Sequence, residues 1–155
     1  MMNDSNAFLL DTNILVYAHD PRDRLKQERA FMVLDSLIRS GRAVLSVQCL
    51  SEFFSAATRR LPEPLEPATA MAQVERLVRS CRVLDLTPTA VLEGCRGSAQ
   101  YGLSIWDALI WAVGKLNQVA YILTEDAEHE RFLEGVRFLN PFHPTFDLAA
   151  LEPGA

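Results

Sequence analysis

The sequence has no apolar run long enough to cross a membrane. Its longest dense apolar stretch, Leu103 to Val113, is interrupted by Asp107 and falls well short of the ~20 residues that a membrane-spanning helix needs. The first six residues are mostly polar and include Asp4, so they lack the basic start and long apolar middle of a signal peptide. We therefore expect a cytoplasmic protein without a membrane partner.

Cysteine is scarce and poorly placed for cross-links. The three cysteines, Cys49, Cys81 and Cys95, are odd in number and show no C-x-x-C spacing. This pattern argues against a disulfide framework and against a zinc site. We expect all three to be buried thiols with a packing role.

Positive charge is also in short supply, since the formal net charge is −5 at pH 7. A protein that coats nucleic acid uses many Lys and Arg side chains to neutralise phosphates, so that function is disfavoured. Thirteen of the fifteen basic residues are nevertheless Arg, which binds phosphate in bidentate fashion. Two groups of arginines are either solvated helix faces or local phosphate-binding patches: Arg22, Arg24 and Arg29, and Arg59 and Arg60.

What the sequence does contain is the composition of an ordinary globular domain. Its 155 residues are 49% hydrophobic and 23% charged, which is too apolar for a disordered chain. No repeat, low-complexity tract or linker divides it. We expect one domain over residues 1–155, with its core at about residues 8–142 and a short Pro-containing C-terminal tail.

Short apolar runs alternate with longer amphipathic segments along the chain. The runs have strand length and mostly lack polar alternation, as buried strands do: Ala7–Leu10, Ala43–Val47, Arg82–Leu86, Ala120–Thr124 and Val136–Leu139. Apolar residues at three- and four-residue spacing predict helices between them: Leu25–Ser40, Gln48–Arg60, Pro67–Ser80, Thr89–Tyr101 and Ile105–Asn117. This alternation predicts an α/β fold in which five strands form a parallel sheet between layers of helices.

Four acidic residues fall where the predicted elements meet one edge of that sheet. Asp11 ends the first strand and Asp126 follows the fourth, and the carboxyl ends of parallel strands form the edge where ligands bind. Glu52 lies about one and a half turns into the helix after the second strand, and Asp107 lies in the first turn of the helix before the fourth. Both helices start at that edge, so we expect the four carboxylates to meet there.

Four carboxylates at one place require a cation. At ~5 Å and an effective dielectric constant of about 20, each pair repels by about 3 kcal/mol. Six pairs would total roughly 20 kcal/mol, more than the ~5–15 kcal/mol of net stability of a domain. Because all four offer oxygen, and no His or Cys accompanies them at zinc spacing, the predicted ion is Mg²⁺ or Mn²⁺.

Each acid taken alone has a simpler explanation. Asp11 could cap a helix, Asp126 could be a turn residue, and Glu52 could occupy a solvated helix position. Asp107 lies three residues after Ser104, where the acid of a capping box belongs. Only the conjunction of the four favours a catalytic centre.

The segments around these acids resemble the successive motifs of PIN-domain nucleases, and those of the bacterial VapC-like toxins in particular. They are LLDTNILVYA at 9–18, LSVQ at 45–48 with SEF at 51–53, LSIWDALI at 103–110, and ILTED at 122–126. The similarity covers about residues 8–142, with the motifs in the family's order and at ordinary spacing. As a set they are highly specific, whereas Asp-Thr-Asn alone would be a weak signal.

The resemblance implies a fold, an activity and partners. The fold is a three-layer α/β/α sandwich whose five-stranded parallel sheet has the order 3-2-1-4-5. The activity is divalent-metal-dependent endoribonuclease cleavage of RNA, as the toxin of a type II toxin-antitoxin pair. The implied partners are a VapB-like antitoxin and a second copy of the chain in a homodimer.

The resemblance also implies a role for each residue of the site. Asp11 and Asp107 would ligate the metal directly, while Glu52 and Asp126 would complete the acidic pocket, directly or through water. Polar residues at three further positions orient the acids or a bound water in the family; here they are Asn13, Ser104 and Thr124. Two helix caps and a strand-end hydroxyl explain these three equally well.

Two other functions compete with a nuclease. A phosphohydrolase of the haloacid dehalogenase kind also has an Asp after its first strand, but its chemistry uses Asp-x-Asp, and position 13 here is Asn. A catalytically silent PIN-fold binding module would keep the fold as a docking surface. The presence of all four acids argues against the silent module.

Overall fold

The computed structural model describes residues 6–151. Residues 1–5 and 152–155, on which the expectations about the polar N-terminus and the end of the C-terminal tail largely fall, lie outside that part. The elements are β1 (Phe8–Leu10), α1 (Thr12–Tyr17), α2 (Arg24–Arg39), β2 (Ala43–Ser46), α3 (Val47–Arg59), α4 (Pro67–Ser80), β3 (Arg82–Leu84), α5 (Pro88–Tyr101), α6 (Ile105–Leu116), β4 (Tyr121–Leu123), β5 (Phe132–Leu133), β6 (Val136–Leu139) and a 3-10 turn, η1 (Leu148–Leu151).

The strands form one mostly parallel sheet in the order β3-β2-β1-β4-β6-β5. Five of them are parallel and correspond to the five predicted strands, with β6 as the fifth, so the predicted order 3-2-1-4-5 is confirmed. The predicted number of strands is wrong by one, because β5 adds an antiparallel strand at the edge next to β6. With two residues, β5 is too short to show a periodic pattern in the sequence.

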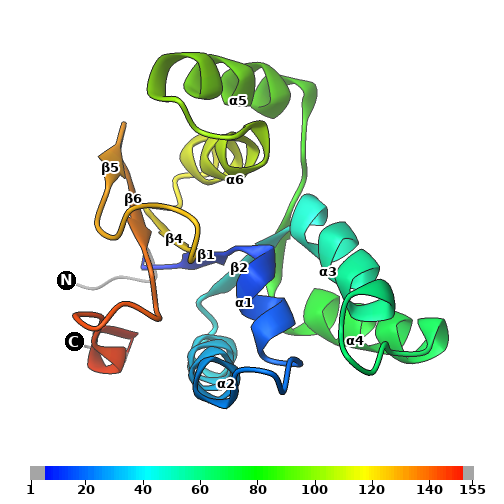
Figure 1. The fold of residues 1–155 in the computed structure, drawn as a ribbon. Helices are drawn as coiled ribbons and strands as arrows, with labels where there is room; N and C mark the ends of the chain where they lie inside the picture. The colour runs from blue at the N-terminus through cyan, green and yellow to red at the C-terminus, as the bar shows by residue number, and fades with distance from the viewer. Residues whose placement is uncertain (1–5, 152–155) are drawn as a thin grey trace.

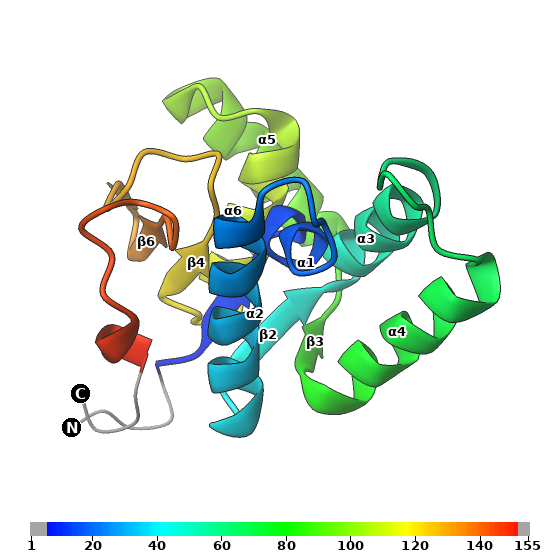
Figure 2. The ribbon, with the colours of Figure 1, turned by 60° about the horizontal axis from the view of Figure 1, so that its bottom comes forward.

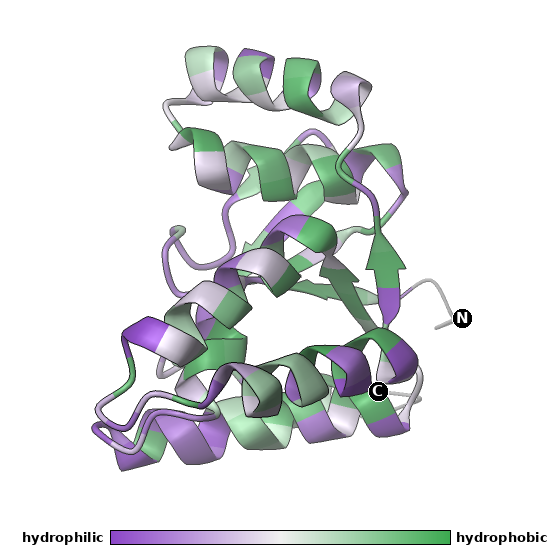
Figure 3. Cartoon of the chain, turned by 90° about the vertical axis from the view of Figure 1, so that its right-hand side faces the viewer, coloured by the Kyte–Doolittle hydropathy of each residue, from purple (hydrophilic) through white to green (hydrophobic). Residues whose placement is uncertain are grey.

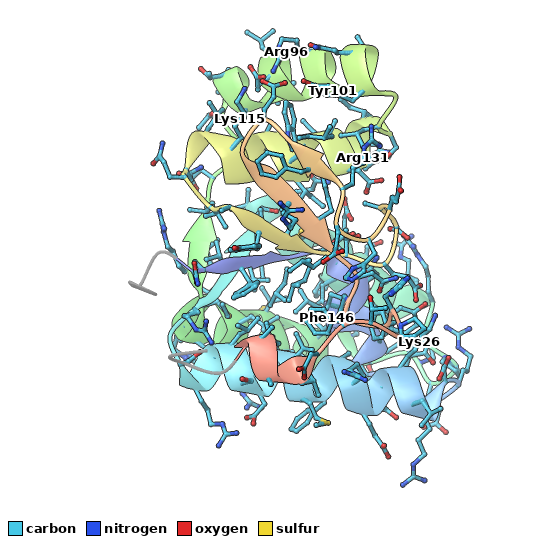
Figure 4. The ribbon with its side chains drawn as sticks, turned by 90° about the vertical axis from the view of Figure 1, so that its left-hand side faces the viewer. Lys26, Arg96, Tyr101, Lys115, Arg131 and Phe146 are labelled. Atoms are coloured by element: carbon cyan, nitrogen blue, oxygen red, sulfur yellow. The ribbon has the colours of Figure 1, made fainter. Side chains whose placement is uncertain are left out.

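A tight turn between β5 and β6 explains the extra strand. Glu134 and Gly135 connect the two strands, and both have positive φ, at 48° and 88°. This backbone is typical of a two-residue hairpin turn, in which Gly is favoured. The Glu134 carboxylate accepts hydrogen bonds from Arg96, Tyr101 and Lys115 on the two helices beside it, and Figure 4 shows these side chains gathered at the hairpin. The network fastens the edge of the sheet to α5 and α6.

Helices cover both faces of the sheet, as the predicted three-layer sandwich requires. On one face Phe8 and Leu10 pack in a core with residues of α1, α2, α3 and α4. On the other face Leu9 packs in a second core with α5 and α6. Figure 1 shows the two helical layers on opposite sides of the strands, and Figure 3 shows mainly hydrophobic strands between helices that carry hydrophilic segments. None of the described helices combines the length and apolarity needed to cross a membrane.

The cysteine expectation is only partly correct. All three thiols are free, but only Cys49 is buried, while Cys81 is half-buried and Cys95 is exposed on α5. Cys95 follows the buried Gly94 and precedes the exposed Arg96, so it lies at the border of the helix face that packs on α6.

Helices α5 and α6 pack closely because α5 presents glycine to a large aromatic ring. A Cβ atom added at Gly97 would lie 2.4 Å from Cζ3 of Trp111, which is fully buried. The indole cannot easily move away, since its Nε1 donates a hydrogen bond to the Leu133 carbonyl at 3.1 Å. Gly94, one turn earlier, is similarly close to Leu109 on α6.

We predict that Gly97→Ala lowers the free energy of unfolding by about 1–3 kcal/mol, the usual cost of overpacking a core. The sign is diagnostic, because Gly→Ala inside a helix ordinarily raises stability by about 0.5–1 kcal/mol. Urea denaturation followed by circular dichroism measures the effect, with Cys95→Ala on the same helix as the control that stays within about 0.5 kcal/mol. A Gly97→Ala protein as stable as the parent would show that the helices are not in close contact here.

Candidate active site

Asp11 occupies the centre of the site because of the sheet register. Parallel pairing places Leu10 of β1 beside Leu123 of β4, so the residues that follow them, Asp11 and Thr124, are neighbours at the carboxyl edge. Asp11 is 5% exposed, and its Oδ2 accepts a hydrogen bond from Thr124 Oγ1 at 2.7 Å. Its Oδ1 accepts from the Thr12 backbone N–H at 2.7 Å, which makes Asp11 the N-cap of α1 as well. The same side chain therefore caps α1 and lies in the candidate site.

Asn13 links two of the predicted acids. Its Nδ2 donates to Asp11 Oδ2 at 3.2 Å and to Asp126 Oδ2 at 3.1 Å. The loop after β4 is fixed from the other side, because the Asp126 backbone N–H donates to Thr124 Oγ1 at 3.1 Å. Asn13 and Thr124 thus both hydrogen-bond to the acids or to their backbone.

Asp107 reaches the same place from the first turn of α6. Ser104 is the N-cap of this helix, and its Oγ accepts a hydrogen bond from the Asp107 backbone N–H at 3.2 Å. The half-buried Asp107 carboxylate then joins those of Asp11 and Asp126, with one oxygen from each residue lying within 4.8 Å of the others. The structure therefore brings three of the four predicted acids into one cluster.

Glu52 is not a member of that cluster, although it lines the cleft into which the three clustered acids open. Its Oε2 accepts from Thr12 Oγ1 at 2.9 Å, and its Oε1 accepts from Gln48 Nε2 at 2.9 Å. Neither Thr12 nor Gln48 was among the candidate residues from the sequence. Gln48 could have been found, since it lies four residues before Glu52 on one helix face, whereas nothing in the sequence pairs Thr12 with residue 52.

Two buried oxygen atoms beside the acids have no hydrogen-bond partner in the described part of the chain. They are Asn13 Oδ1 and Gln48 Oε1, and the amide nitrogens of the same side chains bond the acids. Buried polar atoms of this kind usually meet a water molecule or an ion. The site therefore has oxygen acceptors to spare for a hydrated cation.

Burial makes the acids reluctant to ionise together. The pKa of Asp11 is raised from 3.8 to about 7, first by burial and further by the charges of Asp126 and Asp107, against the lowering effect of the hydrogen bonds from Thr124 and Thr12. Burial also raises the pKa of Asp107, with smaller contributions in the same direction from Asp126 and Glu52. A divalent cation would reverse this preference, because it favours the ionised carboxylates.

The acids open into a cleft of about 670 Å³. All four predicted acids and Asn13 line it, whereas Ser104 and Thr124 are not among its lining residues. Thr124 bonds the Asp11 carboxylate, and Ser104 bonds the Asp107 backbone. Trp106, next to Asp107, lines the cleft with 63% of its surface exposed. An open, acid-lined cleft of this volume lies within the range of ligand sites.

The model of the PIN domain family matches residues 8–134, which include all four acids. The chain belongs to the PIN domain family. No curated protein sequence matches it closely.

Solved structures agree with this fold assignment. A toxin-antitoxin complex from Klebsiella pneumoniae matches the PIN domain with a TM-score of 0.65 at 16% identity, over 88% of this chain and 98% of that one. A DNA-bound VapBC from Salmonella typhimurium gives 0.63 at 18% identity, covering 87% and 98% of the two chains. VapC20 of Mycobacterium tuberculosis, a Sarcin-Ricin loop cleaving toxin, gives 0.59 at 20% identity, covering 75% and 87%. The PIN domain therefore has a VapC-like fold.

We predict that Asp11→Asn stabilises the metal-free PIN domain above neutral pH. The pKa of Asp11 is raised above its unfolded value of 3.8 to about 7, so its contribution to stability is fully present below pH 4 and lost as pH rises to about 7. Asn keeps the shape but cannot ionise, so it escapes this loss. Thermal melts in EDTA should place the variant a few degrees above the parent at pH 8, since about 1 kcal/mol moves the melting temperature of such a domain by about 2–4 °C.

The pH dependence provides the internal control for this experiment. At about pH 3, below both the folded and the unfolded pKa, the Asp11 carboxyl is mostly protonated in both states, so the two melting temperatures should converge. A variant that melts lower than the parent at both pH values would mean that Asp11 is a structural cap without electrostatic strain.

Proposed function

We propose that this PIN domain is a divalent-metal-dependent endoribonuclease that hydrolyses RNA phosphodiester bonds, and that it is the toxin of a type II toxin-antitoxin pair. The observation that carries the proposal is the convergence of the Asp11, Asp107 and Asp126 carboxylates within 4.8 Å, with Glu52 in the same cleft. Three acids supplied by three separate segments gain nothing from this proximity unless a cation joins them.

The residues present fit Mg²⁺ or Mn²⁺. The donor set consists of carboxylate oxygens, the ligands that both ions prefer, and Mg²⁺ keeps several water molecules in such sites. Asp11, Asp107 and Asp126 would hold the ion, and Glu52 would act from the side of the cleft through water. The sequence expectation left open whether Glu52 and Asp126 act directly or through water, with Asp126 as the acid that varies within the family, and the geometry supports Asp126 as the third ligand.

The chain's own residues hold the acids in the positions that the reaction would need. When bound, a divalent cation lowers the pKa of water and offsets charge on the phosphate. Thr124 and Asn13 hold the Asp11 carboxylate, while Thr12 and Gln48 hold both oxygens of Glu52, so the acids are oriented before substrate arrives. In-line attack of water on the phosphodiester bond would leave a 5′-phosphate and a 3′-hydroxyl.

The same proposal covers the partners. The VapBC structures that share this fold are toxin-antitoxin complexes or VapBC bound to DNA, and they support a VapB-like antitoxin for this chain. We place the reaction in the cytoplasm, with the protein as a homodimer and RNA as its substrate. Neutralisation would be simplest if the antitoxin inserted a cationic side chain among Asp11, Glu52 and Asp107.

The competing functions are weaker on specific grounds. A silent binding module would have no need for the neutral donors that orient the acids, yet Thr12, Asn13, Gln48 and Thr124 all bond them. The family match to the PIN domain leaves no support for a haloacid dehalogenase-like phosphohydrolase.

We predict that the purified protein cleaves single-stranded RNA in Mn²⁺ and that excess EDTA abolishes the cleavage. Asp107→Asn should reduce the rate by more than about 100-fold, because even residues that only orient metal ligands often contribute about 10–100-fold. Gel analysis of a labelled RNA measures both effects, and Glu75→Gln on the exposed face of α4 is the matched control. Cleavage that persists unchanged in EDTA, or in Asp107→Asn, would contradict the proposed function.

A further inference from the structure

The cleft is longer than the acidic cluster, and its far end is basic. It runs between α3 on one side and α1 with the following turn on the other; these two helices lie side by side (Figure 2). Glu52, Ala56 and Arg60 line it at four-residue intervals on one face of the α3 segment. Asn13 and Asp20 mark the two ends of the opposite wall. The α3 wall therefore leads from an acid to an arginine, and the opposite wall ends at Asp20, two residues before Arg22.

Arg22 is held firmly at the basic end. Its Nε and Nη2 form a fork on the carboxylate of Asp20, which is 7% exposed, at distances of 2.7–3.1 Å. The Arg22 backbone N–H donates to the same carboxylate at 3.0 Å. Nη2 also donates to the Arg60 carbonyl at 3.4 Å, so the turn after α1 is fastened to the end of α3. The guanidinium is fixed on one edge, yet its side chain stays 61% exposed to the cleft.

Arg60 brings an uncompensated charge to the same end. It follows the last residue of α3 and is exposed, and its guanidinium has no hydrogen bond or ion pair within residues 6–151. The basic end thus holds two arginines against one aspartate. Of the two arginine groups that the sequence singled out, one member of each converges here, whereas Arg24 pairs with Glu28 on α2 and Arg59 does not line the cleft.

The acidic and basic ends of the cleft are too far apart to bind the same phosphate. Arg60 lies eight residues beyond Glu52, which is about 12 Å along a helix axis. One phosphate cannot meet both ends of such a cleft, but successive phosphates of a single strand can. Arginine is suited to this role because its planar fork binds phosphate oxygens in pairs.

We propose that Arg22 and Arg60 form a second phosphate site, which binds a phosphate of the RNA strand flanking the one cleaved at the acids. This inference rests on the proposed function, since it takes the acidic end as the place of cleavage. It explains how a chain with a net charge of −5 can bind RNA: the acidic end receives its phosphate with a cation, and the basic end binds the next part of the strand directly.

The test is RNA binding without cleavage. In an Asp107→Asn background, fluorescence anisotropy with a labelled single-stranded RNA of about eight nucleotides gives the affinity at several salt concentrations. Arg60→Ala should weaken binding and lower the slope of log K against log salt by about 0.7, the value for one phosphate contact on a single strand. Arg59→Ala and Arg24→Ala are the matched controls and should leave the affinity and slope unchanged.

A second series removes the phosphate charge instead of the arginine. RNAs that carry one neutral methylphosphonate linkage, moved along the strand, should show one flanking position where binding is weakened in the background protein and not weakened further in Arg60→Ala. Because Arg22→Ala leaves buried Asp20 unpaired, the Arg22 contribution is measured in the double variant Asp20→Asn, Arg22→Ala, which should lower the slope like Arg60→Ala.

The outcomes separate this proposal from the nuclease itself. If the Arg60 and Arg22 variants bind RNA like the controls, or if the background protein binds no RNA at low salt, the second phosphate site is wrong. The proposed function is judged independently, by Mn²⁺-dependent cleavage in the protein with Asp107 intact.

Discussion

The carboxylates gathered at the carboxyl edge of the parallel sheet repel one another, and the rest of the structure has to hold them there. The topology forces this meeting, because β1 and β4 are neighbours and α6 begins at the same edge. Within residues 6–151, every side-chain hydrogen bond to Asp11 and Glu52 comes from a neutral group: Thr12, Asn13, Gln48 or Thr124. These donors fix the positions of the acids and leave their charge available to a cation.

Because the site is electrostatically strained, stability must come from elsewhere in the fold. Two hydrophobic cores flank the sheet, and the close packing of Gly97 against Trp111 lies between α5 and α6. The ion-pair network at Glu134 holds the outer hairpin to those helices. The walls of the cleft, α1 and α3, belong to the opposite layer (Figure 1). Helix α6 contributes to both the packing and the candidate site, because it carries the buried Trp111 and, in its first turn, Asp107.

The sequence was sufficient to predict the parallel strands and the longer helices, since buried runs and amphipathic spacing reveal each of them locally. It also placed the four acids at one edge of the sheet, where all four line one cleft, but it did not separate Glu52 from the cluster of the other three. It did not reveal α1, whose six residues are too few for a periodic pattern, nor β5, whose two residues depend on the Glu134–Gly135 turn. The bond from Thr12 to Glu52 joins residues forty positions apart and is visible only in three dimensions. The approach of Arg22 to Arg60 is likewise visible only in three dimensions, so the sequence alone did not distinguish solvated helix faces from a phosphate site.

The most direct test of the central claim is a crystal of this protein soaked in Mn²⁺, with anomalous diffraction data recorded at the manganese absorption edge. We expect one strong anomalous peak within coordination distance of the carboxylate oxygens of Asp11, Asp107 and Asp126, and Glu52 reaching it through water. If that position stays empty at millimolar Mn²⁺ and the three carboxylates lie apart, each bonded only as a helix cap or turn residue, then the acids are structural and the account of the site is wrong.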